Sequence, residues 1–126
     1  MNRVLLTGFE PFHRASSNPT EEIVRIIESE KLPNVMTGVL PVEFGRSGTL
    51  ACQLIDENKP DVVISLGQAE GRTDITPEKI AINLDHARIP DNAGNMPNNF
   101  EIISGGADGL FSTLPIDQIV EKLKSA

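Results

Sequence analysis

The chain is poor in the residues that build metal centres, disulfides and aromatic clusters. Its 126 residues include one cysteine, two histidines and no tryptophan or tyrosine. A lone Cys52 cannot close a disulfide within the chain, and no group of Cys and His has the spacing of zinc ligands. The sequence therefore predicts no disulfide, no structural metal and no cofactor.

Excess positive charge and long apolar runs are also lacking. Eighteen acidic residues against eleven basic ones give a net charge of −7, the wrong sign for nucleic acid or an anionic membrane surface. The apolar run at the start is broken by Gly8 and Glu10, and it is too short for a secretory signal or a membrane span. We expect a cytoplasmic protein with a small neutral ligand, no nucleic-acid partner and no membrane partner.

What the chain does contain is an alternation of strand and helix signals. Asn18 fits a helix N-cap and Pro19 the first helical position. The run DVVISL, between Pro60 and Gly67, is typical of a strand covered on both faces. We expect strands at residues 3–9, 35–40 and 61–66, with helices from about residues 18 and 45 whose apolar stripes are Ile23, Val24, Ile26 and Ile27, and Leu50, Ala51, Leu54 and Ile55. This order predicts an α/β fold of three layers, α/β/α, with a mostly parallel sheet.

The second half has a different pattern. From Thr76 to Asp85 polar and apolar residues alternate, which predicts a strand with Glu78 on the same side as the apolar residues Ile80, Ile82 and Leu84. A loop at 89–99 precedes a short predicted strand at 100–103. A helix should follow, with Thr113 as its cap, Pro115 as its opening and a buried stripe of Ile116, Ile119, Val120 and Leu123.

No repeat or linker divides the chain, so residues 1–126 are expected to form one domain. Strands and helices that alternate normally return to the sheet, and the end at Ala126 suggests a domain truncated at its C-terminus. An uncovered stripe on the last helix would favour a homo-oligomer.

Ligand sites of parallel sheets lie at the carboxyl ends of the strands. Phe9 and Phe12 follow the first strand, where their rings could clamp a flat uncharged ligand or plug the core. Gln68 follows the third strand, and its side chain offers the donor and acceptor that an amide ring needs, although a glycine-rich strand exit is more often a plain turn. No GxGxxG or Walker motif supports a nucleotide site.

Two charged residues could also belong to a site. On an apolar strand face the Glu78 carboxylate would be desolvated unless it is paired, with a protonated histidine as a suitable partner; a solvated strand-end Glu is the alternative. Arg88 could stabilise an oxyanion, or it could pair with Asp85 or Asp91. Cys52, inside a helix with no histidine nearby, is not expected to be a nucleophile.

Taken in order, several segments resemble the pyroglutamyl peptidase (pyrrolidone carboxylate peptidase) family. They are VLLTGFEPF at 4–12, NPT at 18–20, LPVEF at 40–44, the specific run GQAEGRTDITPEKIAINLDHARIPDN at 67–92, and FSTLPI at 111–116. The chain departs from the family at His13 and Arg14, where small or loop-forming residues are common. The resemblance covers nearly the whole chain.

The resemblance implies a cysteine peptidase that removes N-terminal pyroglutamate from peptides with a Cys, His and Glu triad. Glu78 would be the triad carboxylate that orients the histidine. Phe9 and Phe12 would line the lactam pocket, Gln68 would fix the ring, and Arg88 would lie near the oxyanion. The family's Cys and His belong to later segments that these 126 residues do not contain, so we expect the chain to be inactive alone. The alternative is a non-catalytic binding or assembly module that keeps the fold.

Overall fold

The computed structural model describes the whole chain, from Met1 to Ala126. It contains two compact units. Unit 1 comprises Met1–Gln68 and Arg88–Met96, and unit 2 comprises Ala69–Ala87 and Pro97–Ala126. The single domain expected from the sequence depends on how these units combine, and it stays a prediction.

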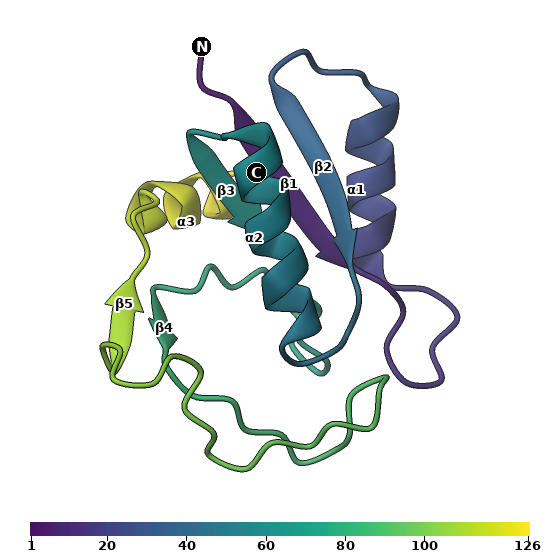
Figure 1. Ribbon diagram of the computed structural model, residues 1–126. Coiled ribbons are helices and arrows are strands. Elements are labelled where there is room, and N and C mark those ends of the chain that lie inside the picture. The colour runs from purple at the N-terminus through teal and green to yellow at the C-terminus, as the bar shows by residue number, and fades with distance from the viewer. The chain divides into compact units, whose positions relative to one another are not determined.

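Unit 1 is built on a three-stranded parallel sheet in the order β2-β1-β3 (Figure 1). The strands are β1 (Val4–Phe9), β2 (Val35–Leu40) and β3 (Val62–Ser65). The central strand β1 pairs with β2 from Val4↔Val35 to Phe9↔Leu40, and with β3 from Val4↔Val62 to Thr7↔Ser65. The predicted parallel sheet is confirmed.

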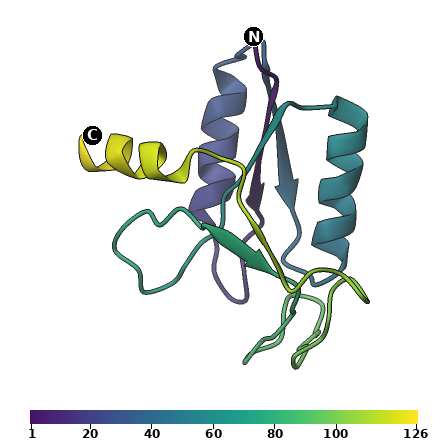
Figure 2. The ribbon, with the colours of Figure 1, turned by 90° about the vertical axis from the view of Figure 1, so that its left-hand side faces the viewer.

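Two helices cover opposite faces of this sheet (Figure 2). They are α1 (Pro19–Ser29) and α2 (Arg46–Asn58). The Asn18 side chain accepts a hydrogen bond from the backbone N–H of Thr20, and Pro19 is the first residue of α1, so both predicted start signals are confirmed. A parallel sheet flanked by helices confirms the α/β class.

The apolar stripe predicted for α1 is only half right. Val24 is fully buried and Ile27 is half-buried, whereas Ile23 and Ile26 are exposed. The buried side of the helix follows Thr20, Val24 and Ile27, at i, i+4 and i+7. Ile23 and Ile26 lie to the side of this row and face solvent. On α2 the predicted stripe is half-buried at Leu50, Ala51 and Leu54 and exposed at Ile55, and Cys52 is exposed.

Gly8 allows α1 to approach β1 closely. A Cβ atom at this position would lie 2.6 Å from the carbonyl oxygen of Thr20, in the first turn of α1. Since real Cβ atoms do not come that close to backbone, the seam between β1 and α1 requires glycine here.

Unit 2 contains a two-stranded antiparallel sheet of β4 (Ile80–Ile82) and β5 (Gly109–Phe111). The strand predicted from Thr76 to Asp85 is therefore wrong in length, and β5 was not predicted. Pairing covers three residues, and beyond them the Asn83 N–H donates to the Asp108 carbonyl while the Asn83 side chain binds the backbone of Ile103. Glu78 lies outside the strand.

The strand predicted at 100–103 is also wrong. Phe100 makes one isolated bridge with Asp85, in which each backbone N–H donates to the other residue's carbonyl. Ile103 is bound instead by the Asn83 carboxamide, which donates to its carbonyl and accepts from its N–H, both at 2.8 Å. A side chain thus takes the place of a strand partner.

The last helix, α3 (Ile116–Lys124), occurs where it was predicted. Its predicted cap is wrong: Pro115 occupies the N-cap position, and no side chain caps the helix. Three residues of the predicted stripe, Ile116, Ile119 and Val120, are half-buried, and Leu123 is 36% exposed. Self-association through this stripe stays a prediction. None of the helices is long and apolar enough to cross a membrane.

Candidate functional site

The exits of the parallel strands form the candidate site of unit 1. Because β1 and β2 are parallel and in register to their last pair, Phe9↔Leu40, their following loops leave from the same edge of the sheet. Leu66 continues β3 at that edge, where its N–H donates to the carbonyl of Thr7. This edge is where an α/β protein places a ligand.

The backbone around Phe9 is held by the start of α1. The Phe9 N–H donates to Thr20 Oγ1 at 2.8 Å, and Thr20 Oγ1 donates in turn to Asn18 Oδ1 at 2.8 Å. Asn18 Nδ2 also donates to the carbonyl of Glu10, and the Glu10 N–H donates to the carbonyl of Leu40. Asn18 and Thr20 are both buried, so these bonds compete little with water.

Phe12 lies at a turn of the same loop. The N–H of Ala15 donates to the Phe12 carbonyl at 3.2 Å, and His13 has a φ of 60°, in the left-handed region that non-glycine residues adopt rarely. The rings of Phe12 and His13 have centroids 6.0 Å apart and are tilted by 46°. Both Phe9 and Phe12 are half-buried, so each ring keeps an accessible surface.

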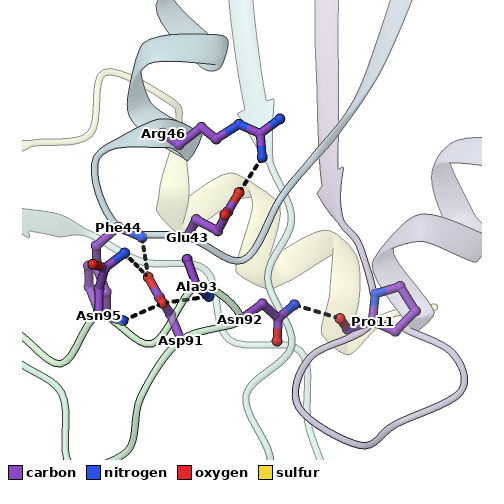
Figure 3. Close-up of polar contacts among 8 residues, drawn as sticks. All are labelled: Pro11, Glu43, Phe44, Arg46, Asp91, Asn92, Ala93 and Asn95. Carbon is purple, nitrogen blue, oxygen red and sulfur yellow. Dashed lines mark hydrogen bonds and ion pairs between the residues drawn. The ribbon is translucent and has the colours of Figure 1, made fainter.

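A loop from the later part of unit 1, residues 88–96, is bonded to the exits of β1 and β2 (Figure 3). Asp91 Oδ2 accepts from the Phe44 N–H at 2.7 Å, and the Asn92 N–H donates to the Val42 carbonyl at 3.0 Å. The Asn92 carboxamide donates to the Pro11 carbonyl and accepts from the His13 N–H, both at 3.0 Å. Nearby, Arg46 pairs with Glu43 at 2.6 Å. The loop joins the two exits.

Asp91 is the most completely bonded carboxylate of unit 1. It is only 9% exposed, and its oxygens accept from the N–H groups of Phe44, Ala93 and Asn95 and from the Asn95 side chain. Burial works to raise the pKa of Asp91, but these four hydrogen bonds outweigh it and hold the pKa below its ordinary value. Asp91 is therefore ionised, and its oxygens are occupied by donors of its own fold.

Gln68 and Arg88 are both exposed residues of unit 1. Within that unit neither side chain makes a hydrogen bond or ion pair. The predicted pair of Arg88 with Asp91 is wrong, because backbone and amide donors already occupy both oxygens of Asp91. Asp85 belongs to unit 2, and its pairing with Arg88 stays a prediction.

Glu78 belongs to unit 2, in the segment before β4. Its side chain is 78% exposed, and Glu78 Oε1 lies 3.4 Å from Arg72 Nη1. The same Arg72 nitrogen donates to Thr76 Oγ1 at 2.8 Å. The expected apolar strand face is wrong, and the solvated alternative describes Glu78 better, because the strand begins two residues later.

Unit 1 therefore places Phe9 at the end of β1, Phe12 in the loop after it, Gln68 after the third strand and Arg88 in the loop bonded to the backbone beside Phe12. Sequence reasoning missed Asn92 and gave Asp91 the wrong partner. The signal for their local turn was present in DNAGN at 91–95, since Asp and Asn side chains bind backbone groups a few residues away. Nothing local indicated their distant bonds to Phe44, Pro11 and His13.

A parallel sheet with helices on both faces defines an α/β protein, and the polar and aromatic side chains at the carboxyl edge of its strands make that edge the candidate ligand site. The chain belongs to the pyroglutamyl peptidase family, a family of cysteine peptidases, whose pattern it matches over residues 2–126. No group of three or more His, Cys, Asp or Glu side chains comes together in a way that could hold a metal ion.

Relatives and solved structures agree with this assignment. The chain is 47% identical over 128 aligned residues to pyrrolidone-carboxylate peptidase 1 of Photorhabdus laumondii, covering 100% of this chain and 58% of the relative. It is 44% identical to pyrrolidone-carboxylate peptidase 1 of Ralstonia nicotianae, covering 100% of this chain and 60% of that protein.

Among solved structures, pyroglutamyl peptidase I of Bacillus amyloliquefaciens superposes with a TM-score of 0.93 at 40% identity, covering 99% of this chain and 62% of that one. A mutant pyrrolidone carboxyl peptidase of Pyrococcus furiosus gives a TM-score of 0.90 at 42% identity, covering 98% and 60%. The chain thus spans about 60% of the length of the relatives it matches.

Proposed function

We propose that this chain carries the lactam pocket and the triad carboxylate of a peptidase that removes N-terminal pyroglutamate from peptides. The observation that carries the proposal is the β1 exit loop. In a member of this family, Phe9 at the end of β1 and Phe12 in the loop after it are half-buried, and the backbone beside each is hydrogen-bonded at the carboxyl edge of a parallel sheet.

The pocket side of the proposal follows from the chemistry of the ligand. A pyroglutamyl ring is flat and uncharged, with one N–H donor and one carbonyl acceptor. The faces of Phe9 and Phe12 can pack against such a ring, and the free carboxamide of Gln68 can supply the complementary acceptor and donor. Arg88, with no partner in unit 1, is available for a developing oxyanion.

The catalytic side of the proposal rests on Glu78. Its carboxylate is exposed and contacts only one guanidinium at 3.4 Å, so it can still accept a hydrogen bond from a histidine. The cysteine nucleophile and this histidine would come from segments beyond residues 1–126. Cys52, exposed on α2, is not that nucleophile, and the chain should not turn over substrate by itself.

Release of a chromophore from a pyroglutamyl amide tests the catalytic side. We expect the purified chain to match the buffer blank. A chimera in which this chain replaces the matching part of the Photorhabdus relative should be active, and Glu78→Gln in the chimera should lower kcat/KM by roughly 10²–10⁴-fold, as for a triad carboxylate. Turnover by the isolated chain that alkylation of Cys52 abolishes would contradict the proposal.

Binding of 2-pyrrolidone, the bare lactam, tests the pocket separately. In ¹H–¹⁵N spectra of the isolated chain, the lactam should shift signals of the β1 exit and of Gln68. Gln68→Ala should weaken this effect. The matched control is Gln53→Ala on α2, where the exposed side chain donates a hydrogen bond to Glu57, and it should change nothing. Lactam binding without activity in the chimera would favour the binding-module alternative.

A further inference from the structure

One carboxamide binds the backbone on both sides of Phe12. Asn92 Nδ2 donates to the carbonyl of Pro11, and Asn92 Oδ1 accepts from the N–H of His13, each at 3.0 Å. Phe12 is the single residue between these two points. The Asn92 side chain therefore acts on Phe12 as a strand partner would, although the loop has no strand there.

The backbone that carries the Asn92 side chain is itself held in place. Its own N–H donates to the Val42 carbonyl, and the preceding residue, Asp91, is buried and accepts four hydrogen bonds, one of them from Phe44. Val42 and Phe44 follow β2 directly. The position of the Asn92 carboxamide is thus set by the sheet, 79 to 81 residues away in sequence from the groups it holds.

The β1 exit loop needs such a hold. Its two ends are bonded through Glu10 and Asn18, but between them the only backbone bond within the loop is the turn from Ala15 to Phe12. His13, next to Phe12, has the left-handed backbone that non-glycine residues rarely keep without support.

We propose that Asn92 is a positioning residue that fixes the ring of Phe12 in the lactam pocket. The part concerning the pocket rests on the proposed function. Phe9 is held separately, through Thr20 and Asn18 at the start of α1, so the two rings have independent anchors. Each anchor can be removed while the other serves as the control.

Fluorine NMR tests the hold without any ligand. The chain has five phenylalanines, so labelling with 4-fluorophenylalanine gives five signals that Phe→Leu variants can assign. Asn92→Ala should shift and narrow the Phe12 signal and speed hydrogen exchange of the His13 amide about tenfold or more, leaving the Phe9 signal in place. Thr20→Val should shift and narrow the Phe9 signal and leave the Phe12 signal in place.

Asn92→Asp refines the test because it keeps the acceptor for His13 and loses the donor to Pro11. It should preserve the slow exchange at His13 and give a Phe12 signal between those of the other two proteins. Asn92 is exposed, so neither variant disturbs the core. An unchanged Phe12 signal in Asn92→Ala would overturn the proposal, and so would loss of the fold in both variants, which would make Asn92 a general structural residue.

Titration with 2-pyrrolidone then connects the hold to the pocket. If release leaves Phe12 in place only a tenth of the time, the apparent Kd of Asn92→Ala should rise about tenfold. A lactam that binds neither protein would count against the pocket in the proposed function, whereas the ring and amide signals would still decide whether Asn92 holds Phe12. Equal affinities of the two proteins, with Phe12 released in the variant, would overturn the role in the pocket.

Discussion

The two units contain carboxylates in opposite situations. In unit 1 Asp91 is 9% exposed and accepts four hydrogen bonds from its own chain, whereas in unit 2 the Glu78 side chain is 78% exposed and meets one guanidinium. A carboxylate whose acceptor sites are filled by its own fold has none left for a partner. The contrast indicates that Asp91 stabilises the fold, whereas the Glu78 carboxylate can still accept hydrogen bonds from another group.

Removing each carboxylate should show the largest difference between them. Asp91→Ala leaves the N–H groups of Phe44, Ala93 and Asn95 without their acceptor, and Asp91→Asn turns an NH₂ group toward donors. Both should lower the urea midpoint of unfolding far more than Glu78→Ala, which should change stability by no more than about 0.5 kcal/mol.

The matched control within unit 1 is Asp56→Ala, because the Asp56 side chain is exposed and its ion pair with Lys59 is long, at 3.6 Å. It should behave like Glu78→Ala. If Asp91→Ala were as stable as this control, the structural role of Asp91 would have to be abandoned.

The pH dependence of stability should show the next largest effect, which concerns Asp91. The folded pKa of Asp91 lies below its ordinary value, so its contribution to stability is complete above the unfolded pKa of about 3.9 and is lost as the pH falls through the folded pKa. Urea midpoints measured from about pH 7 downward should therefore fall more steeply below about pH 4 in the native chain than in Asp91→Ala. Parallel curves for the native chain and Asp91→Ala would refute the linkage.

The smallest effect is expected for the pair of Arg72 and Glu78. At 3.4 Å, with both side chains more than half exposed, this ion pair should contribute no more than about 0.5 kcal/mol. A double-mutant cycle with Arg72→Ala and Glu78→Ala, read from urea unfolding at low and high salt, measures the coupling. A coupling free energy several times larger and insensitive to salt would show that Glu78, like Asp91, stabilises the fold.

Much of unit 1 could be predicted from the sequence because its signals are local. Asn18 and Pro19 define the start of α1, and a continuous β-branched run defines β3. Unit 2 was predicted less well, because the alternation of polar and apolar residues from Thr76 to Asp85 looks like a strand whether or not a partner strand is present. The partner, β5, pairs over only three residues, too few for a pattern of its own, and just beyond them the Asn83 side chain binds Ile103.

The candidate site likewise contains residues that local signals predict and residues that depend on distant contacts. Phe9 ends a strand and Phe12 and Gln68 follow strands, so a rule about strand exits is enough to find all three. The exposure of Glu78 depends on where β4 begins, and the role of Asn92 depends on backbone groups of Pro11 and His13 at the other end of the chain. Periodicity carries no information about contacts at such separations, even though DNAGN marks the turn itself.

The central place of β1 has a consequence for the order in which the protein is made. β1 leaves the ribosome before either neighbour, and β2 and β3 follow only at Val35 and Val62. One edge of the nascent strand can be covered once α1 and β2 have emerged, but the other stays open until Ser65 has been synthesised. During that interval an apolar strand with unpaired backbone groups is accessible to other nascent chains, so the time between the emergence of β1 and the emergence of β3 favours aggregation and the binding of chaperones.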